Sequence, residues 1–395
     1  MTAGRAPIMV VYGTRPEAIK VAPVIKALEK SPTLFPITVI TAQHREMLDQ
    51  VNEVFGITPD VDLDLMQPGQ SLNQIAARVI AGLDTVYEEH RPAAVLVQGD
   101  TTTVKAAAIA AFNREIPVVH LEAGLRSGDL ASPFPEEANR KLVSQIAALH
   151  LAPTEQARRN LLRDGVDDAT ITVTGNTVID ALRWAVKVPA RYHDPALKAL
   201  ERSSQPMLLL TSHRRENLGE PMQRIGRAVA QLAHARPDLL VVWPAHRNPA
   251  VRSAIGPEVA GCANVIVTEP VGYDEFSHLI NRSHVVLTDS GGLQEEAPSL
   301  GKPVLVLREN TERPEAVAAG TARLVGTDTQ RIVSEVSRLL DDASAYAAMS
   351  EAVSPYGDGH AAEYGVAAME ALVADTTESP RSAQGQTLDS AGGAQ

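Results

Sequence analysis

The segment Asp289–Glu296 has the residue types of a phosphate-binding turn, with two glycines followed by a pair of carboxylates. It lies between two apolar runs, His284–Thr288 and Pro303–Leu307, so the local order is strand, glycine-rich turn, helix and strand. Glycine lets a ligand approach the backbone closely, and the free N–H groups at a helix start attract anions. Glu296 lies about one turn further on, where a carboxylate accepts sugar hydroxyls. We expect a nucleotide with its diphosphate at this turn and its ribose at Glu296; the alternative is an ordinary tight connection with a solvated Glu pair.

Carboxylates and basic residues elsewhere supply the other candidates for chemistry. Asp100 and Glu122 end buried runs, Glu136 opens a predicted helix, and His213 ends the first strand of the second half. The side chains that could neutralise a diphosphate are Arg15, Lys20, Arg214 and Arg313. Structural roles are the alternative for several of these groups. Asp100 would cap the Thr-rich helix that follows it, Glu136 would complement a helix N-terminus, and Lys20 would lie on a solvated helix face.

Motifs for several other chemistries are missing from the sequence. The first predicted strand is not followed by G-x-G-x-x-G, and Gly301-Lys302 runs into Pro303, so neither a nicotinamide dinucleotide nor a Walker A loop is indicated. H-E-x-x-H, paired cysteines and G-x-S-x-G are missing too, which disfavours a metal site and a serine hydrolase. Asp60-Val-Asp62-Leu-Asp64 alternates like a strand with one solvated face, and we favour that interpretation over a metal site. We expect neither a metal nor a redox cofactor.

Composition narrows the class of protein further. The chain of 395 residues exceeds the usual size of one core, so two domains are expected. No apolar run approaches the ~20 residues that span a bilayer, and residues 1–7 lack a secretory core, so no membrane segment is expected. The single cysteine, Cys262, fits a reducing, cytoplasmic location. The net charge of −12 disfavours nucleic acid as a partner.

Short apolar runs alternate with amphipathic segments such as Glu17–Lys30, which has an apolar stripe at helical spacing. The runs lack strict alternation, which is typical of strands covered on both faces and therefore of parallel sheets. The predicted strands are Ile8–Tyr12, Ile37–Thr41, Ala94–Gln98, Ile116–Leu121, Ala148–Ala152, Ile171–Thr174, Met207–Thr211, Leu239–Trp243, Asn264–Thr268, His284–Thr288 and Pro303–Leu307. This order predicts an α/β protein with two doubly wound domains.

A polar, proline-bounded segment, Pro189–Pro206, separates the two series of strands. We therefore predict an N-terminal domain at 1–190, a C-terminal domain at 191–375 and a disordered, Ser/Thr/Gly/Gln-rich tail at 376–395. Polar clusters follow nearly every predicted strand, and ligands of open α/β sheets bind beyond the carboxyl ends of the strands. Two such edges predict a ligand held in a cleft between the domains.

Eight motifs along the chain resemble those of one known family, the bacterial non-hydrolysing UDP-N-acetylglucosamine 2-epimerases, from roughly Ile8 to Ala374. The motifs are Gly13-Thr-Arg-Pro-Glu-Ala-Ile-Lys20, Gln98-Gly-Asp-Thr-Thr-Thr103, His120-Leu-Glu-Ala-Gly-Leu-Arg126, Pro133-Phe-Pro-Glu-Glu-Ala-Asn-Arg140, Ser212-His-Arg-Arg-Glu-Asn217, Asp289-Ser-Gly-Gly-Leu-Gln-Glu-Glu296, Thr311-Glu-Arg-Pro-Glu315 and Pro355-Tyr-Gly-Asp-Gly359. The resemblance implies the glycosyltransferase-B fold, with two Rossmann-like domains facing a cleft and the last helix packing back on the first domain.

The resemblance also implies roles for individual residues. The residues similar to the family's catalytic groups are Asp100, Glu122, Glu136 and His213. Those similar to its substrate-binding groups are Arg15, Lys20, Phe276, Ser290, Gly291, Gly292, Glu296 and Arg313. A second, activating UDP-GlcNAc site is implied at Gln43, His44, Gln70, Arg214 and His246, and its presence would distinguish the chain from hydrolysing relatives.

The implied reaction interconverts UDP-GlcNAc and UDP-ManNAc, a precursor of cell-envelope polysaccharides, and we expect a homodimer. The proton at C2 has no adjacent ketone, so simple deprotonation is implausible. Loss of UDP from C1 acidifies C2–H, and elimination to a 2-acetamidoglucal followed by readdition inverts C2. The scheme needs cations around the diphosphate and more than one carboxylate, with acid and base still to be assigned. The alternatives are a glycosyltransferase that uses UDP-GlcNAc, a hydrolysing epimerase and a non-catalytic sugar-nucleotide sensor.

Overall fold

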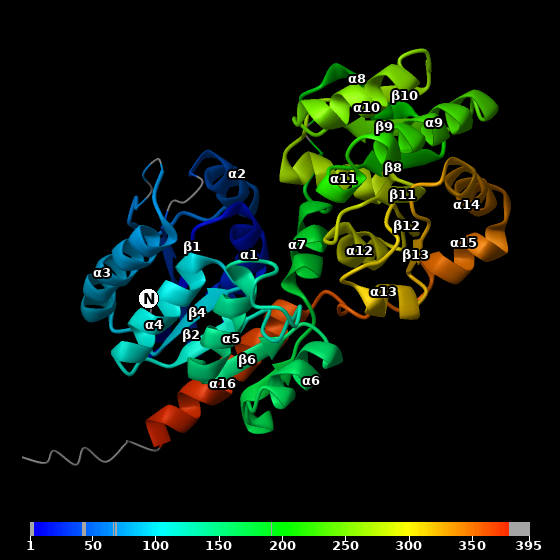
Figure 1. Ribbon diagram of the computed structural model, residues 1–395. Coiled ribbons are helices and arrows are strands. Elements are labelled where there is room, and N and C mark those ends of the chain that lie inside the picture. Colours follow the sequence, from blue (N-terminus) through cyan, green and yellow to red (C-terminus); the bar gives the residue numbers. More distant parts are fainter. Residues whose placement is uncertain (1–3, 42–44, 66, 68, 191, 379–395) are drawn as a thin grey trace, which may run out of the picture.

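The computed structural model describes residues 4–41, 45–65, 67, 69–190 and 192–378, which form two parallel sheets with helices on both faces (Figure 1). The first sheet has the order β3-β2-β1-β4-β5-β6-β7 and the second the order β10-β9-β8-β11-β12-β13. The strands of the first sheet are β1 (Ala6–Tyr12), β2 (Leu34–Ile40), β3 (Val61–Asp62), β4 (Ala94–Gln98), β5 (Val118–Leu121), β6 (Leu149–Ala152) and β7 (Ile171–Val173). Those of the second are β8 (Met207–Thr211), β9 (Leu240–Pro244), β10 (Val265–Thr268), β11 (Val285–Thr288), β12 (Val304–Val306) and β13 (Ala322–Leu324).

The helices cover both faces of each sheet, as the predicted α/β class requires. Those before the second sheet are α1 (Arg15–Lys30), α2 (Arg45–Phe55), α3 (Leu72–His90), α4 (Thr102–Asn113), α5 (Glu136–Ile146), α6 (Glu155–Arg163), α7 (Thr177–Ala185) and α8 (Pro195–Lys198). Those that follow are α9 (Glu220–Ala235), α10 (Pro249–Val259), α11 (Tyr273–Arg282), α12 (Leu293–Glu296), α13 (Pro314–Ala318), α14 (Thr329–Asp341), α15 (Ala343–Ser350) and α16 (Ala361–Glu378).

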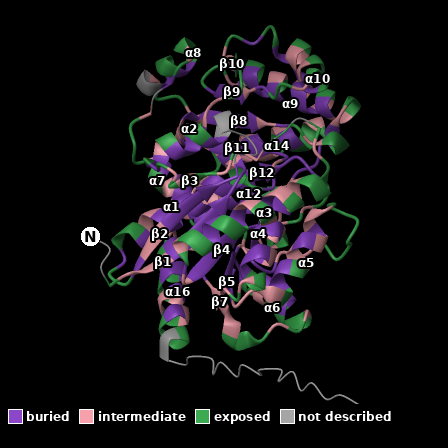
Figure 2. Cartoon of the chain, turned by 90° about the vertical axis from the view of Figure 1, so that its left-hand side faces the viewer, coloured by how far each residue is buried: buried purple, intermediate pink, exposed green. Residues whose placement is uncertain are grey.

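Burial on both faces explains why the strands are continuously apolar. Along β1, Ile8 and Val10 belong to one buried cluster while Met9 and Val11 belong to the cluster on the opposite face. Successive side chains of a strand point to opposite faces, so a doubly covered strand needs apolar residues at every position. Figure 2 shows the consequence, with buried strands enclosed by helices whose outer faces are exposed. The predicted fold class, with two doubly wound Rossmann-like domains, is confirmed.

Two elements connect the halves of the molecule. Helix α7 contributes Ile179 and Leu182 to a core of the second sheet, whereas its Ala181 and Ala185 pack in a core of the first. Helix α16 returns to the first sheet (Figure 1), where it packs against α1 and buries Met369. The chain therefore crosses between the two sheets once before α7 and again before α16.

The structure refines several expectations from the sequence. Strands β3 and β13 join the eleven predicted strands, and β3 lies in the alternating Asp60–Asp64 segment. The segment 189–206 holds α8, whose Leu197 is buried in a core of the second sheet. Helix α16 continues to Glu378, so the first three residues of the predicted tail are helical, and 379–395 lie outside the described residues. The domain division at residue 190 stays a prediction. Among the described residues, no helix combines the length and apolarity needed to cross a membrane.

Candidate active site

The candidate residues gather where the strand order of each sheet reverses. In the first sheet β1 lies between β2 and β4, and in the second β8 lies between β9 and β11. Loops leaving adjacent strands at such a point run in opposite directions and leave room for a ligand beyond the carboxyl ends. The loops at these points carry Arg15 and Asp100 in the first half, and His213 and Ser290 in the second.

Glu17 fixes the first of these loops. It forms a capping box with Thr14: its Oε2 accepts hydrogen bonds from the backbone N–H groups of Gly13 (2.6 Å) and Thr14 (3.0 Å). Its Oε1 accepts one from the Thr101 hydroxyl at 2.7 Å. Burial raises the pKa of the Glu17 carboxyl, and these donors oppose that shift. One buried carboxylate thus joins the loop after β1 to the loop after β4, next to Asp100.

Asp100 is held by side chains of α5. Its Oδ2 accepts hydrogen bonds from Arg140 Nε at 2.8 Å and pairs with Arg140 Nη2 at 2.6 Å. Its backbone carbonyl accepts a hydrogen bond from the Asn139 amide at 2.8 Å. Burial raises the pKa of Asp100, with Glu122 adding to the rise, while Arg140 opposes it. The carboxyl is therefore oriented, partly exposed and easier to protonate than an ordinary Asp.

Glu122 follows β5, and three side chains donate to its carboxylate. Its φ of 64° places it in the left-handed region, which non-glycine residues rarely adopt. Lys20 forms an ion pair with its Oε1, and Gln98 Nε2 donates to its Oε2 at 2.5 Å. Asn176 Nδ2 also donates to Oε1, at 3.2 Å. Burial alone would raise the pKa of Glu122, but Lys20 and the other donors hold it below its ordinary value. Glu122 is thus an ionised, buried acceptor.

Glu136 and Glu137 have different surroundings at the start of α5. Glu136 is the first residue of the helix and is half-buried. Glu137 is fully buried: it accepts hydrogen bonds from the N–H groups of Ser127 (3.0 Å) and Gly128 (3.2 Å) and pairs with Arg140 at 3.1 Å. Glu137 therefore shapes the loop before α5 and supports the arginine that holds Asp100.

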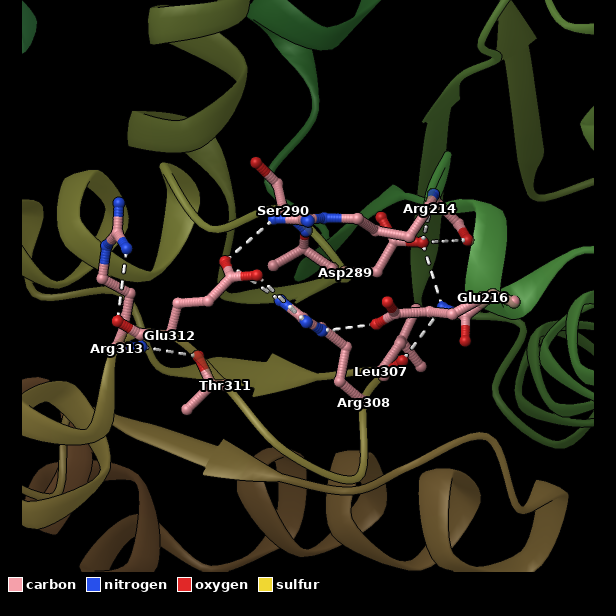
Figure 3. Close-up of polar contacts among 12 residues, drawn as sticks. Arg214, Glu216, Asp289, Ser290, Leu307, Arg308, Thr311, Glu312 and Arg313 are labelled. Carbon is pink, nitrogen blue, oxygen red and sulfur yellow. Dashed lines mark hydrogen bonds and ion pairs between the residues drawn. The ribbon is translucent and has the colours of Figure 1, made fainter. Parts of the chain in front are cut away.

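In the second half, Asp289 organises the loop after β8 (Figure 3). Its fully buried carboxylate accepts hydrogen bonds from the Ser212 hydroxyl (2.8 Å), the His213 N–H (3.0 Å), the Arg214 N–H (3.0 Å) and the Asn217 amide (3.1 Å). The His213 ring lies 3.4 Å from Asp289 and is partly exposed. Burial lowers the pKa of His213, so the ring is neutral at pH 7. Asp289 thus presents a neutral imidazole beside the Ser290 turn.

The turn itself is joined to the loop that carries Arg313. Gln294, fully buried, donates to the Ser290 carbonyl at 3.1 Å and accepts from the Thr311 hydroxyl at 2.6 Å. The Arg313 N–H in turn donates to Thr311 Oγ1 at 3.0 Å (Figure 3). The helix predicted after the turn is present as α12, which has only four residues. A short helix has a weak dipole, so the charge of Arg313 matters more here than the helix start.

Arg214 belongs to a row of alternating charges on this face. Its guanidinium lies 3.3 Å from Glu312, which also pairs with Arg308 at 3.4 Å, and Arg308 pairs with Glu216 at 2.7 Å (Figure 3). Arg308 is largely buried, whereas Glu312 and Glu216 are more than half exposed. The row places Arg214 close above Gly291, where a Cβ would lie 3.5 Å from its Nη2.

Glu295 and Glu296 face different groups. Glu295 is buried: it pairs with Arg313 and accepts a hydrogen bond from Asn176 Nδ2 at 2.7 Å. Burial and the neighbouring Glu295 raise the pKa of Glu296 to about 7, which Lys20 and Arg15 oppose. Arg15, from the first half, is therefore close enough to Glu296 for the two charges to interact across the halves.

The remaining predicted substrate groups are the two glycines of the turn and Phe276. Gly292 is the residue before α12, and a Cβ there would meet Glu296 Oε2 at 3.7 Å and Ser290 Oγ at 3.9 Å, which is ordinary contact. Neither Gly291 nor Gly292 has a positive φ, so the backbone conformation alone does not require glycine there. Phe276 lies on α11 and packs, partly buried, against a core of the second sheet.

The predicted second site is only partly described. Gln43 and His44 lie outside the described residues. Gln70 is hydrogen-bonded within its own loop, accepting from the Gln67 N–H at 2.7 Å and donating to the Leu65 carbonyl at 3.2 Å. His246, exposed after β9, stacks on His213 with ring centroids 5.7 Å apart. Of the five residues, Arg214 and His246 therefore lie next to the candidate catalytic histidine.

Sequence reasoning missed the residues that hold the candidates in place. They are Glu17, Glu137, Asn139, Arg140, Asn176, Asp289, Gln294 and Glu295. The Thr14-x-x-Glu17 spacing was a readable signal, because it is a capping box. Asp289 and Glu295 sit in a motif already singled out, but their burial depends on contacts with residues far away in the chain.

Comparison with known proteins gives matches over most of the chain. The family model described as UDP-N-acetylglucosamine 2-epimerase matches residues 26–370. UDP-N-acetylglucosamine 2-epimerase of Escherichia coli (strain K12) is 52% identical over 360 residues, covering 90% of this chain and 96% of the relative. A crystal structure of UDP-GlcNAc 2-epimerase from Neisseria meningitidis bound to UDP-GlcNAc has 47% identity and a TM-score of 0.80, covering 92% of this chain and 100% of that one.

A more distant structure, of the glycotransferase of kitacinnamycin, has 15% identity and a TM-score of 0.61 and shares the fold alone. The family model, by contrast, spans most of the chain, and identity near one half extends over nearly its whole length. The chain belongs to the UDP-N-acetylglucosamine 2-epimerase family.

Proposed function

We propose that this protein is an enzyme that interconverts UDP-GlcNAc and UDP-ManNAc without a redox cofactor or a metal. The observation that carries the proposal is the meeting of two sets of groups between the sheets. Ionised Glu122 and easily protonated Asp100 come from the first half, while Arg313 and Glu296 come from the second. The names of the relatives supply the substrate, since one of them was solved with UDP-GlcNAc bound.

Binding of the nucleotide is assigned to the second half. The ribose hydroxyls donate to Glu296, the diphosphate lies over the Ser290–Gly292 turn beside Arg313, and the uracil lies near Phe276. Arg15 reaches the same region from the first half. Because Arg313 is paired with Glu295, and Lys20 with Glu122, the two cations are already oriented before the diphosphate arrives. Such preorganised charge stabilises a leaving group without further rearrangement.

The proposed chemistry is elimination followed by readdition. As the C1–O bond to UDP breaks, C2–H becomes acidic, and a carboxylate takes the proton to give the 2-acetamidoglucal. UDP then returns to C1 while an acid delivers a proton to the opposite face of C2. The depressed pKa of Glu122 suits the base and the raised pKa of Asp100 suits the acid, with roles exchanged in the reverse direction. Glu136 and neutral His213 flank the sugar and the diphosphate.

Incubation with UDP-GlcNAc in heavy water, followed by NMR, tests the proposal. Elimination places solvent deuterium at C2 of UDP-ManNAc, and the nucleotide pool stays intact. Free ManNAc and UDP would instead identify a hydrolysing epimerase. If UDP-GlcNAc stayed unchanged, the protein would be a glycosyltransferase or a sugar-nucleotide sensor. Epimerisation without deuterium at C2 would exclude the elimination mechanism.

The proposal also includes an activating ligand, an oligomeric state and a cellular location. Arg214 and His246 adjoin His213, which supports a second UDP-GlcNAc bound next to the first, with Gln43, His44 and Gln70 completing its site. Four large apolar side chains on the α4–α5 side are more than half exposed, which supports a homodimer: Phe112, Leu130, Phe134 and Leu142. We place the enzyme in the cytoplasm, where it would supply UDP-ManNAc for cell-envelope polysaccharides.

A further inference from the structure

Two crossings of the chain between the sheets meet at Gly175 and Asn176. The backbone N–H of Asn176 donates to the Tyr356 carbonyl at 2.8 Å. Gly175 has a φ of 88°, and a Cβ there would lie 3.0 Å from the Tyr356 oxygen and 3.1 Å from Gly357 Cα. The segment before α7 is therefore in backbone contact with the segment before α16. Because the two segments are in such close contact, Asn176 has little conformational freedom.

The Asn176 side chain is fixed from both ends of its carboxamide. It is 3% exposed. Its Oδ1 accepts a hydrogen bond from the Val178 N–H at 3.2 Å, as the N-cap of α7. The helix therefore determines which end of the amide is oxygen, and both N–H groups of Nδ2 must point the other way.

Those two N–H groups reach a carboxylate on each side of the molecule. One contacts Glu122 Oε1 at 3.2 Å, and the other contacts Glu295 Oε2 at 2.7 Å. Glu122 also holds Lys20, and Glu295 also holds Arg313. The result is one continuous row of partners, in the order Lys20, Glu122, Asn176, Glu295, Arg313, that runs from the first half to the second.

We propose that Asn176 is a positioning residue that orients Glu122 for proton transfer and couples it, through Glu295, to the diphosphate-binding Arg313. The proposal rests on the proposed epimerase function. A neutral double donor is the group that can stabilise two carboxylates at once without adding charge between them. The coupling gives a physical reason for chemistry to wait on the nucleotide: a diphosphate that draws on Arg313 changes the partner of Glu295 and hence the hold of Asn176 on Glu122.

The charged groups around Glu122 and Glu295 determine how a substitution at Asn176 changes the pH dependence of the reaction. Lys20 and Arg313 favour ionised Glu122, whereas Asp100 opposes it; near Glu295 lie Arg313, Lys20, Glu296 and the Tyr356 hydroxyl. A hydrogen bond to the charged form lowers a carboxyl pKa, so removing the Asn176 donor moves the pKa of Glu122 upward. The acid limb of the pH profile then moves to higher pH.

Three variants separate this role from capping. Asn176→Ser keeps an N-capping hydroxyl but loses both amide N–H donors. Asn176→Asp keeps the shape and the cap but places a third carboxylate between Glu122 and Glu295. Asp328→Ser changes the exposed N-cap of α14, away from the site, and controls for a change of cap alone.

The assay measures epimerisation of UDP-GlcNAc against pH. We expect kcat of Asn176→Ser to fall on the order of tenfold, about 1.4 kcal/mol of barrier, with KM changed less than about threefold. The acid limb of the pH profile should move to higher pH, by about half a pH unit in Asn176→Ser and by about one unit in Asn176→Asp. Alkaline pH should therefore partly restore the turnover of both variants. Asp328→Ser should keep the wild-type profile. A wild-type acid limb in both Asn176 variants, or a fall in kcat that is equal at every pH, would overturn the proposal.

A measurement without turnover separates this inference from the proposed function. Glu122 loses its amide donor in Asn176→Ser, so the difference in melting temperature from wild type should be larger at pH 8 than at acid pH below the lowered pKa of Glu122, where its carboxylate takes up a proton. If wild-type protein fails to epimerise UDP-GlcNAc but this difference appears, the proposed function is wrong and the electrostatic link stands. If the difference is independent of pH, the link itself is refuted.

Discussion

The substitution Asp289→Asn tests whether one buried carboxylate builds the second half of the site. Asp289 is fully buried and accepts from four donors: the Ser212 hydroxyl, two backbone N–H groups at His213 and Arg214, and the Asn217 amide. A hydrogen bond to a charged acceptor contributes about 1 kcal/mol more than a neutral one, so losing the charge over four donors costs about 3–4 kcal/mol. The NH₂ group of the new Asn also faces these donors and cannot accept from them, which lowers the stability further.

A loss of this size is a large part of the stability of an ordinary domain, about 5–15 kcal/mol. Urea unfolding followed by tryptophan fluorescence reports it, because Trp243 is buried in a core of the second sheet. With an m value of ~2 kcal/mol/M, the midpoint should fall by about 1.5–2 M. Activity should fall as well, since His213 and Arg214 lose their backbone anchor.

The matched control is Asp238→Asn, an exposed Asp on the same half that pairs only loosely with Arg236, at 3.4 Å. Such surface changes stay within about 0.5 kcal/mol. If Asp289→Asn unfolded at the same urea concentration as this control, the carboxylate would not be the organiser of the loop, and the reasoning from its four donors would fail.

Three further outcomes are expected. Asp100→Asn should bind UDP normally by calorimetry but lower kcat by ~10²-fold, and near-normal turnover would exclude Asp100 as an acid or base. Glu296, with its pKa raised to about 7, binds a proton more tightly in the folded state, so its burial costs stability as pH rises from about 4.3 to 7. Glu296→Gln should therefore be more stable than wild type at pH 8, and it should lose the tightening of UDP binding that wild type shows between pH 6 and 8. Equal melting temperatures of the two proteins at pH 8 would contradict this. Gly124→Ala would place a Cβ 2.3 Å from the Ala157 carbonyl oxygen and should lower stability by about 2 kcal/mol or more in urea unfolding, well beyond the effect of Gly128→Ala, where the φ is also positive but the space is open.

The strands and their class followed from local pattern. All eleven runs predicted as strands recur within a few residues of the observed bounds, because strands buried on both faces need apolar side chains throughout. The two additional strands are short: β3 has two residues and β13 has three, and neither carries a continuous apolar run. The extent of α16 was also misjudged at its end, where Thr376–Glu378 continue the helix despite their polarity.

The candidate site was likewise predictable from the sequence only in part. Motif resemblance selected Asp100, Glu122 and Arg313. The topology places Asp100 at the switch point of the first sheet, while Glu122 and Arg313 follow β5 and β12, the strands next to β4 and β11. The environment that gives them chemistry was not readable from local spacing. Arg140, which holds Asp100, is 40 residues away, and Asn176 lies 54 residues from Glu122.

The sequence by itself determined the alternation of strands and helices, the glycine-rich turn at Ser290 and the family, since each depends on residues close together in the chain or on ordered motifs. The tertiary structure alone decided which carboxylates are ionised, which cations are already paired and which amide joins the two halves. The physical reason is that burial and partnership are set by contacts such as that between Asn176 and Glu295, 119 residues apart, which form only when both sheets have packed.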